Sequence, residues 1–252
     1  MLRDTWLIFR RDMTAALRNP TWVLIGIMQP LLYLFLFGPL MVRTVQDQGL
    51  SEMDGWMLLT PALIAQLALF GSSFVGFGLL AEFRSGVVER FRVTPVSRTA
   101  LLLGKVLANA LQAMVQAVLI IALAYLAFDL DAPVGGVLLS LVVVFLLAVS
   151  LASCSYALAL TLKSEETFPA LLNAVLIPLL LLSGILLPMS LAPGWLQAIS
   201  DVNPFKHVVE GARSFFTGEY GSSTAWWGLG LTVAMAVLGW WFGVRRFTRE
   251  SS

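Results

Sequence analysis

Six long stretches without a charged residue divide this 252-residue chain, and they limit its fold more than any other feature. A helix needs about 20 consecutive apolar residues to cross the hydrocarbon core of a bilayer, and a charge at its centre costs roughly 2.5–3.5 kcal/mol. The six stretches are Asn19–Val42, Gly55–Ala81, Val106–Phe128, Ala132–Leu162, Thr167–Ser200 and Tyr220–Val244. They predict an all-α integral membrane protein with six transmembrane helices in a single transmembrane domain, residues 1–252.

The composition excludes several other classes of protein. Only 12% of the residues are charged, about half the usual share of a soluble domain, so a soluble enzyme is excluded. The single cysteine, Cys154, and the single histidine, His207, form neither an intrachain disulfide nor a conventional zinc site. A formal net charge of +1 indicates no nucleic-acid partner.

Lys and Arg gather in alternate connections between the stretches, which predicts the orientation of the chain. One side carries Arg3, Arg10, Arg11, Arg18, Arg84, Arg90, Arg92, Arg98, Lys105, Lys163, Arg245, Arg246 and Arg249, and the other carries only Arg43, Lys206 and Arg213. Because cytoplasmic loops are enriched in basic residues, we expect both termini to lie in the cytoplasm.

Residues 1–18 form a predicted amphipathic helix before the first stretch. Leu2, Trp6, Phe9, Met13 and Leu17 share one face, and most of the opposite face is basic. Such a helix lies in the membrane interface, where its arginines approach anionic lipid headgroups. It either anchors the topology alone or also contacts a cytoplasmic partner.

The fifth stretch is too long for one crossing, and Pro188 and Pro193 are expected to break it. Asn203 and Pro204 then open another helix as N-cap and first residue. On its polar side, Lys206, Glu210 and Arg213 are spaced for ion pairs. Residues 188–219 are therefore predicted to form an outer helical hairpin, either re-entrant or anchored at the interface.

The second loop, residues 82–98, carries most of the cytoplasmic charge. Val87 and Phe91 share one face of a predicted short helix that Pro95 ends, and Ser97 can cap the next span. Composition alone leaves two interpretations equal, a compact rigid knob and a solvated turn that only sets the topology.

The spans contain no Asp, Glu, Lys, Arg or His, which argues against a carrier driven by protons or ions. Gly104 and Lys105 are followed by Val106, where a P-loop requires Ser or Thr. We therefore expect no ATPase site in this chain, no catalytic residues and no metal site, so any energy for transport comes from another chain.

These features resemble the membrane permease subunit of type-2 ABC exporters (ABC-2 family), which include antibiotic-resistance permeases of the daunorubicin type. The resemblance covers nearly the whole chain. The residues that carry it are Glu82, Gly86, Glu89, Arg90, Thr94, Pro95, Ser97 and Arg98 in the second loop and Asn203, Pro204 and Arg213 in the outer hairpin. Phe83, Arg84, Phe91 and Arg92 are bulkier and more basic than the family pattern.

The resemblance implies a half-transporter in which two permeases pair as a homodimer or heterodimer. Each copy docks its second loop on a separate ABC ATPase subunit, which binds ATP and Mg²⁺, so this chain binds no cofactor. The implied coupling residues are Glu82, Arg84, Gly86, Val87, Glu89, Arg90, Phe91, Thr94 and Pro95. The implied substrate path, bordered by the second and fifth spans, contains Gln66, Phe70, Phe74 and Asn173.

The expected function is export of hydrophobic or amphipathic compounds, such as drugs or natural products, across the cytoplasmic membrane of a bacterial-type cell. The uncharged, aromatic second span fits such a cargo better than a charged polymer. Export of a lipid or a lipid-linked glycan is one alternative. A non-transporting membrane scaffold or sensor of the same fold is another.

Cysteine labelling tests the predicted topology. We expect cysteines placed at Asp47 and Glu219 to react with an impermeant reagent applied outside, and cysteines at Arg92 and Arg249 to be protected, because the basic loops lie inside. Labelling of position 92 from outside would contradict the orientation.

Overall fold

The computed structural model describes residues 2–19, 21–47, 49, 51–84, 97–186, 189 and 192–249. Within these ranges all regular structure is helical, as the sequence predicts. Five helical segments are long and apolar enough to cross a membrane, namely Leu24–Gln46, Glu52–Glu82, Arg98–Phe128, Val134–Leu162 and Ser223–Thr248. The protein is therefore a multi-pass membrane protein.

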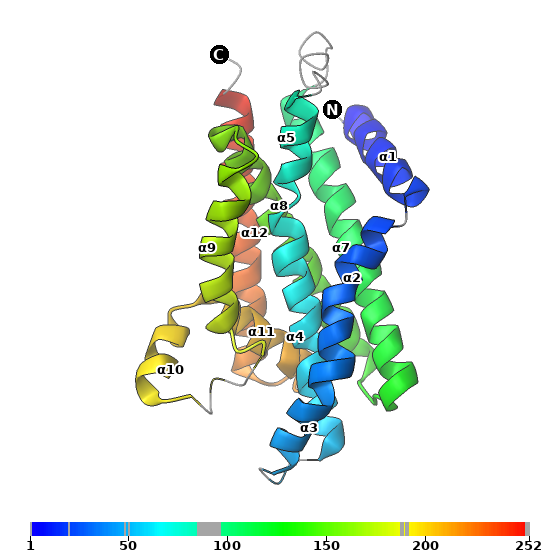
Figure 1. The fold of residues 1–252 in the computed structure, drawn as a ribbon, viewed down its shortest axis with the longest axis vertical. Coiled ribbons are helices and arrows are strands. Elements are labelled where there is room, and N and C mark those ends of the chain that lie inside the picture. Colours follow the sequence, from blue (N-terminus) through cyan, green and yellow to red (C-terminus); the bar gives the residue numbers. More distant parts are fainter. Residues whose placement is uncertain are drawn as a thin grey trace.

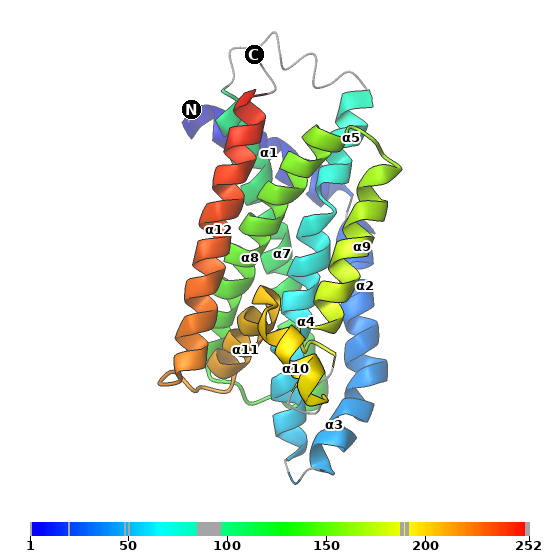
Figure 2. The same cartoon turned by 90° about the vertical axis from the view of Figure 1, so that its left-hand side faces the viewer.

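The helices form one bundle along a common long axis (Figure 1). In chain order they are α1 (Leu2–Arg18), α2 (Thr21–Leu32), the π-helix η1 (Tyr33–Phe37), α3 (Gly38–Gln46), α4 (Glu52–Ser73), α5 (Gly76–Arg84), α7 (Arg98–Phe128), α8 (Val134–Leu162), α9 (Thr167–Leu181), α10 (Gly194–Asp201), α11 (Pro204–Phe216) and α12 (Ser223–Arg249). Helix α1 and the end of α12 lie at one end of the bundle, and α3, α10 and α11 lie towards the other (Figure 2). We call these the inner and outer ends, following the predicted orientation.

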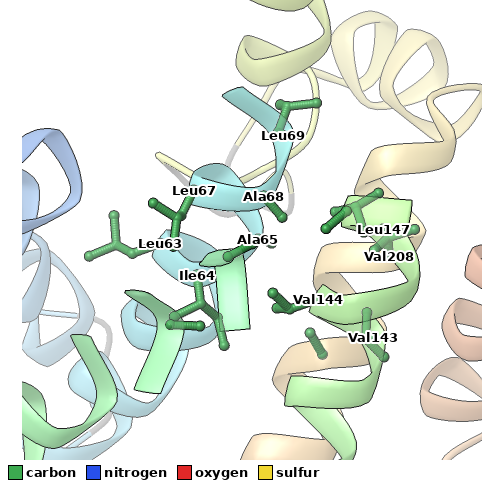
Figure 3. Packing of buried hydrophobic residues seen from close by; sticks show 14 of the residues in the cluster. Leu63, Ile64, Ala65, Leu67, Ala68, Leu69, Val143, Val144, Leu147 and Val208 are labelled. Atoms are coloured by element: carbon green, nitrogen blue, oxygen red, sulfur yellow. The ribbon is translucent and has the colours of Figure 1, made fainter. Parts of the chain in front are cut away.

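Helix α4 forms the centre of the bundle. Of its 22 residues, 15 are buried, and it packs against α3, α7, α8 and α11. Figure 3 shows Ala65 and Ala68 of α4 on the side towards Val144 and Leu147 of α8. Because α4 is apolar on all sides, it has no amphipathic face, which is typical of a helix enclosed by other helices.

Small residues bring α8 and α12 into close contact. A Cβ atom on Gly239 of α12 would lie 2.7 Å from the backbone oxygen of Ser150 in α8, so only glycine fits there without a shift. The Ser150 hydroxyl also donates a hydrogen bond to the Met235 oxygen at 2.7 Å. Close packing of small residues and interhelical hydrogen bonds are the main sources of association between membrane helices.

The second span is interrupted between α4 and α5, at Phe74 and Val75. The hydroxyl of Ser155 in α8 donates to the Ser73 oxygen at 2.5 Å and accepts from the Gly76 N–H at 2.8 Å. One side chain thus satisfies a backbone acceptor on one side of the break and a donor on the other, as an apolar environment requires.

The fifth predicted stretch breaks as expected, but earlier than at Pro188. Helix α9 contains only 15 residues and ends at Leu181. At 1.5 Å per residue α9 is about 22 Å long, shorter than the roughly 30 Å hydrocarbon core. The chain turns at Gly184, whose φ of 74° favours glycine. Six complete spans therefore remain a prediction.

Helix α1 has the predicted bounds but docks through another face than its apolar stripe. Thr5 and Ile8 are buried against α7, where a Cβ on Gly104 would lie 2.8 Å from the Ile8 Cβ. Leu2 and Trp6 stay exposed. The sequence could not reveal this docking, because the contact depends on the glycine in α7. The exposed stripe remains available for the predicted lipid interface.

The two hydrogen bonds of Ser155 bridge the α4–α5 break, and two serines of α8 allow this bridge to be tested. We expect Ser155→Ala to destabilise the purified protein by about 1–3 kcal/mol, because it leaves a buried donor and acceptor unpaired. Ser153→Ala is the matched control. Among the described residues, the buried Ser153 hydroxyl bonds only the Val149 oxygen of its own helix, so its loss is expected to be nearly neutral. Equal thermal unfolding midpoints for the two variants would contradict the bridge.

Candidate functional site

Four charged side chains meet at the inner end of the bundle. Lys105 Nζ of α7 lies 2.9 Å from Glu82 Oε2 at the end of α5 and 3.7 Å from Asp12 Oδ2 of α1. Arg11 Nη2 lies 3.2 Å from Glu82 Oε1 and 2.8 Å from Asp12 Oδ1. The Lys105 side chain is only 6% exposed. We call these four residues the inner ion cluster, which connects α1, α5 and α7.

A cavity of about 200 Å³ adjoins the inner ion cluster, with Asp12, Glu82 and Lys105 in its wall. Asn109 and Tyr156 also line it, and the buried Asn109 Oδ1 has no hydrogen-bond partner in the described part of the chain. A water molecule occupies about 30 Å³ in the liquid, so the cavity has room for several waters. The inner end of the bundle is therefore a polar and hydratable region beside the α4–α5 break.

Of the predicted coupling residues, the structure describes only Glu82 and Arg84. Gly86, Val87, Glu89, Arg90, Phe91, Thr94 and Pro95 lie outside the described residues, so their short helix stays a prediction. Ser97 caps α7 as expected, because its hydroxyl accepts from the Ala100 N–H at 3.3 Å. Both ends of the second loop, α5 and α7, are thus joined through the inner ion cluster.

Arg84 points to a second inner connection. Its Nη1 lies 2.6 Å from Oε2 of Glu165, in the turn between α8 and α9. The two residues border an open cavity of about 450 Å³ with Lys163, Ser164 and Glu166. The Arg84 side chain is 76% exposed, so this ion pair contributes little to stability. The turn between α8 and α9 nevertheless shares one surface with the root of the second loop.

The sequence did not identify Asp12, Lys105 or Glu165 as partners of the coupling residues. In the sequence analysis, Lys105 was one of the basic residues that indicate which side of the membrane is cytoplasmic. The available signal was its position after Gly104, at the start of an otherwise apolar helix. A lysine there must either reach solvent or find carboxylates, but which carboxylates it finds depends on packing.

At the outer end, Asn203 begins α11 as predicted. Its Oδ1 accepts from the Phe205 N–H at 3.0 Å, and Pro204 occupies the first turn. Lys206 Nζ pairs with Glu210 Oε1 at 3.7 Å and also with Asp201. The hydrogen bond from Lys206 holds the pKa of the Asp201 carboxyl below its ordinary value, so this ion pair stays charged at neutral pH.

Arg213 does not lie on an exposed polar side of α11, so that part of the prediction was wrong. It forms no ion pair with Glu210 in the described structure and is buried instead. Its Nε donates to the Leu58 oxygen of α4 at 2.9 Å, and its Nη2 donates to the Gly184 oxygen at 2.9 Å. The spacing rule failed because α11 packs against α4 and α8, so the side that carries Arg213 faces protein rather than water.

The four residues of the predicted substrate path do not share one surface within a single subunit. Gln66 is 1% exposed, and neither atom of its amide group has a hydrogen-bond partner among the described residues. Phe70 and Phe74 are partly buried against the core. Asn173 is exposed on α9. Whether any of them meets a substrate stays a prediction.

Comparison with known proteins places these features in context. The chain matches the ABC-2 type transporter family over residues 3–217. It is 26% identical over 227 residues to the daunorubicin resistance ABC transporter permease protein DrrB1 of Streptomyces coeruleorubidus, covering 90% of this chain and 78% of that protein. It is 24% identical over 220 residues to DrrC of Mycobacterium tuberculosis (strain H37Rv), a chain named for doxorubicin resistance, covering 85% and 77%. A transport permease of Porphyra purpurea, ycf38, is 27% identical over 210 residues, covering 83% and 70%.

The inner ion cluster can be tested by removing its buried cation. We expect Lys105→Met to destabilise the protein by about 1–3 kcal/mol, because Glu82 and Asp12 then share only Arg11. Arg84→Met is the matched control and should cost at most about 1 kcal/mol, because its ion pair is exposed. Thermal unfolding in detergent compares the two. A smaller loss in Lys105→Met than in Arg84→Met would show that the cluster does not stabilise the inner end.

Proposed function

This chain belongs to the ABC-2 type transporter family, and on that premise we propose that it is the permease subunit of an ATP-driven exporter. A separate ATPase subunit supplies the energy, and the cargo is a hydrophobic or amphipathic compound that leaves the cell across a bacterial-type cytoplasmic membrane. Similarity to a daunorubicin resistance permease over 90% of this chain supports the class of cargo.

The observation that carries the proposal is the inner ion cluster. A loop that receives force from an ATPase must be joined rigidly to the spans that it moves. Glu82 is the third residue before the undescribed segment 85–96, and it is held by Lys105 of α7 and Arg11 of α1. A movement of the loop would therefore reach α1, α5 and α7 together.

The sequence of the second loop supports docking on the ATPase. Glu89 and Arg90 offer charged hydrogen bonds, and Val87 and Phe91 offer an apolar contact beside them. This chain lacks a P-loop after Gly104 and Lys105, so ATP and Mg²⁺ belong to the partner.

The exposed amide of Asn173 supports pairing with a second copy. It lies at the middle of α9, among exposed apolar side chains such as Leu171 and Val175. An amide that faces lipid lacks hydrogen-bond partners, and amides of membrane helices usually bond to other helices. A second permease that covers α9 would supply such partners and place the substrate path between the copies.

Two variants of the second loop test the coupling. We expect Glu89→Arg and Phe91→Asp to insert normally but to abolish ATP-dependent export from vesicles and to weaken co-purification of the ATPase, because loss of one charged partner of a buried pair costs about 2–5 kcal/mol in binding. Glu219→Arg, a charge reversal at an exposed outer position, is the matched control and should export normally.

The permease purified alone completes that test. It should hydrolyse no ATP, and with its ATPase it should form a complex containing two copies of each chain. Hydrolysis by the permease alone, or normal export by both loop variants, would contradict the proposed coupling. An ATPase complex that moves a lipid or lipid-linked glycan but no drug would instead support the alternative cargo, and one that moves nothing would support a scaffold.

Cysteine cross-linking tests the pairing through α9. In a Cys154→Ala chain, we expect Asn173→Cys to form a disulfide between two copies in the membrane, because both copies place this residue near the shared interface. Val118→Cys on α7 is the matched control, since it is equally apolar in setting and 47% exposed but lies on another helix. Cross-linking at position 118 with none at position 173 would place the interface elsewhere.

A further inference from the structure

The C-terminal end of α9 leaves backbone carbonyl groups in a buried part of the outer end, where they need hydrogen-bond donors. The last four carbonyl groups of a helix have no partner within the helix. Helix α9 is only 15 residues long, and it ends among the buried residues Leu180, Ser183 and Ile185. Unpaired carbonyls in such a place are costly, because no water reaches them.

Side chains of the outer hairpin satisfy two carbonyls at this end. The Asn203 Nδ2 donates to the Leu179 oxygen, within the last turn of α9, at 2.9 Å, and the Ser200 hydroxyl donates to the Leu182 oxygen, just after α9, at 2.7 Å. The Pro178 and Leu180 oxygens are bonded locally, by the Leu182 and Ser183 N–H groups. Ser200 and Asn203 are themselves buried. Polar residues at the end of α10 and the start of α11 therefore cap a helix that precedes them by about 20 residues.

Arg213 extends the same arrangement to the central helix. Its guanidinium donates through Nη2 to the Gly184 oxygen, in the turn after α9, and through Nε to the Leu58 oxygen of α4. A cation near the C-terminal end of a helix is also favoured by the helix dipole. Lysine offers donors from a single point, whereas the planar fork of arginine can serve two separate carbonyls.

We propose that the end of α9, helices α10 and α11 and the outer part of α4 move as one rigid body during export, with Arg213 as the residue that positions them. This inference rests on the proposed export function and deepens it. The hairpin does not lift from α9 as a lid, because lifting would strip buried carbonyls and a buried guanidinium of their partners in every cycle. Cargo therefore leaves where this body separates from the second permease.

Distance measurements between spin labels test the rigid body. Leu181 of α9 and Ile199 of α10 are 56% and 50% exposed, and each directly precedes one of the two residues joined by the Ser200–Leu182 bond. In a Cys154→Ala complex with the ATPase, assembled so that only one of the two permease copies carries labels, labels on Leu181→Cys and Ile199→Cys should give one unchanged distance without nucleotide and with trapped ATP. A second, longer distance in either state would overturn the proposal.

A tether between the same two positions adds a functional measurement. A reversible bifunctional thiol reagent that joins the two cysteines within one subunit should leave ATP-dependent export within about twofold of the untethered complex. Loss of export on tethering, with recovery after reduction, would show that the hairpin must separate and would overturn the proposal. If the untethered complex exports nothing, the proposed function fails, while the label distances still decide whether the body is rigid.

Substitution of Arg213 tests its role as the positioning residue. Arg213→Met should broaden the label distance distribution and lower export about tenfold, and Arg213→Lys should recover only part of both, because it can serve one carbonyl. Lys206→Met on the same helix is the matched control, since it breaks ion pairs with Asp201 and Glu210 that lie nearer the surface. A narrow distribution and normal export in Arg213→Met would remove Arg213 from the proposal.

Discussion

Every backbone N–H and C=O group inside a bilayer must find its partner within the protein, and this requirement explains two irregular places in the bundle. Where the second span breaks between α4 and α5, the hydroxyl of Ser155 serves one carbonyl and one N–H. Where α9 ends early, Asn203, Ser200 and Arg213 serve carbonyls at its end and in the turn that follows. At both places a neighbouring helix brings polar side chains to the interrupted backbone.

Buried cations lie at both ends of the described bundle, and each end pairs them differently. At the inner end, Lys105 and Arg11 form ion pairs with Glu82 and Asp12. These pairs connect α1 with α5 and α7, the two helices that flank the second loop. At the outer end, Arg213 is buried against carbonyl oxygens. The first arrangement suits the transfer of force from a partner, and the second suits a rigid outer body, so both agree with a permease driven from its cytoplasmic side.

Several parts of the candidate site could be predicted because their signals are local. Ser97 and Asn203 cap their helices as expected, since a cap needs only its own residue and the next turn. Arg213 was assigned wrongly to a polar side, because i,i+3 spacing describes an isolated helix and ignores what packs on it. The docking of α1 through Thr5 and Ile8 was missed for the same reason, since the space for it is supplied by Gly104 of α7.

The sequence by itself determined that the chain enters the membrane and where most of its spans lie, because the cost of placing a charge in hydrocarbon depends on that residue alone. It also determined the bounds of α1. Only the tertiary structure decided that α9 ends at Leu181, before the predicted break at Pro188, that Lys105 joins Glu82 and Asp12, and that Arg213 turns inward. Each of these depends on a partner far away in the chain, and the energy of such a contact exists only after the helices have packed.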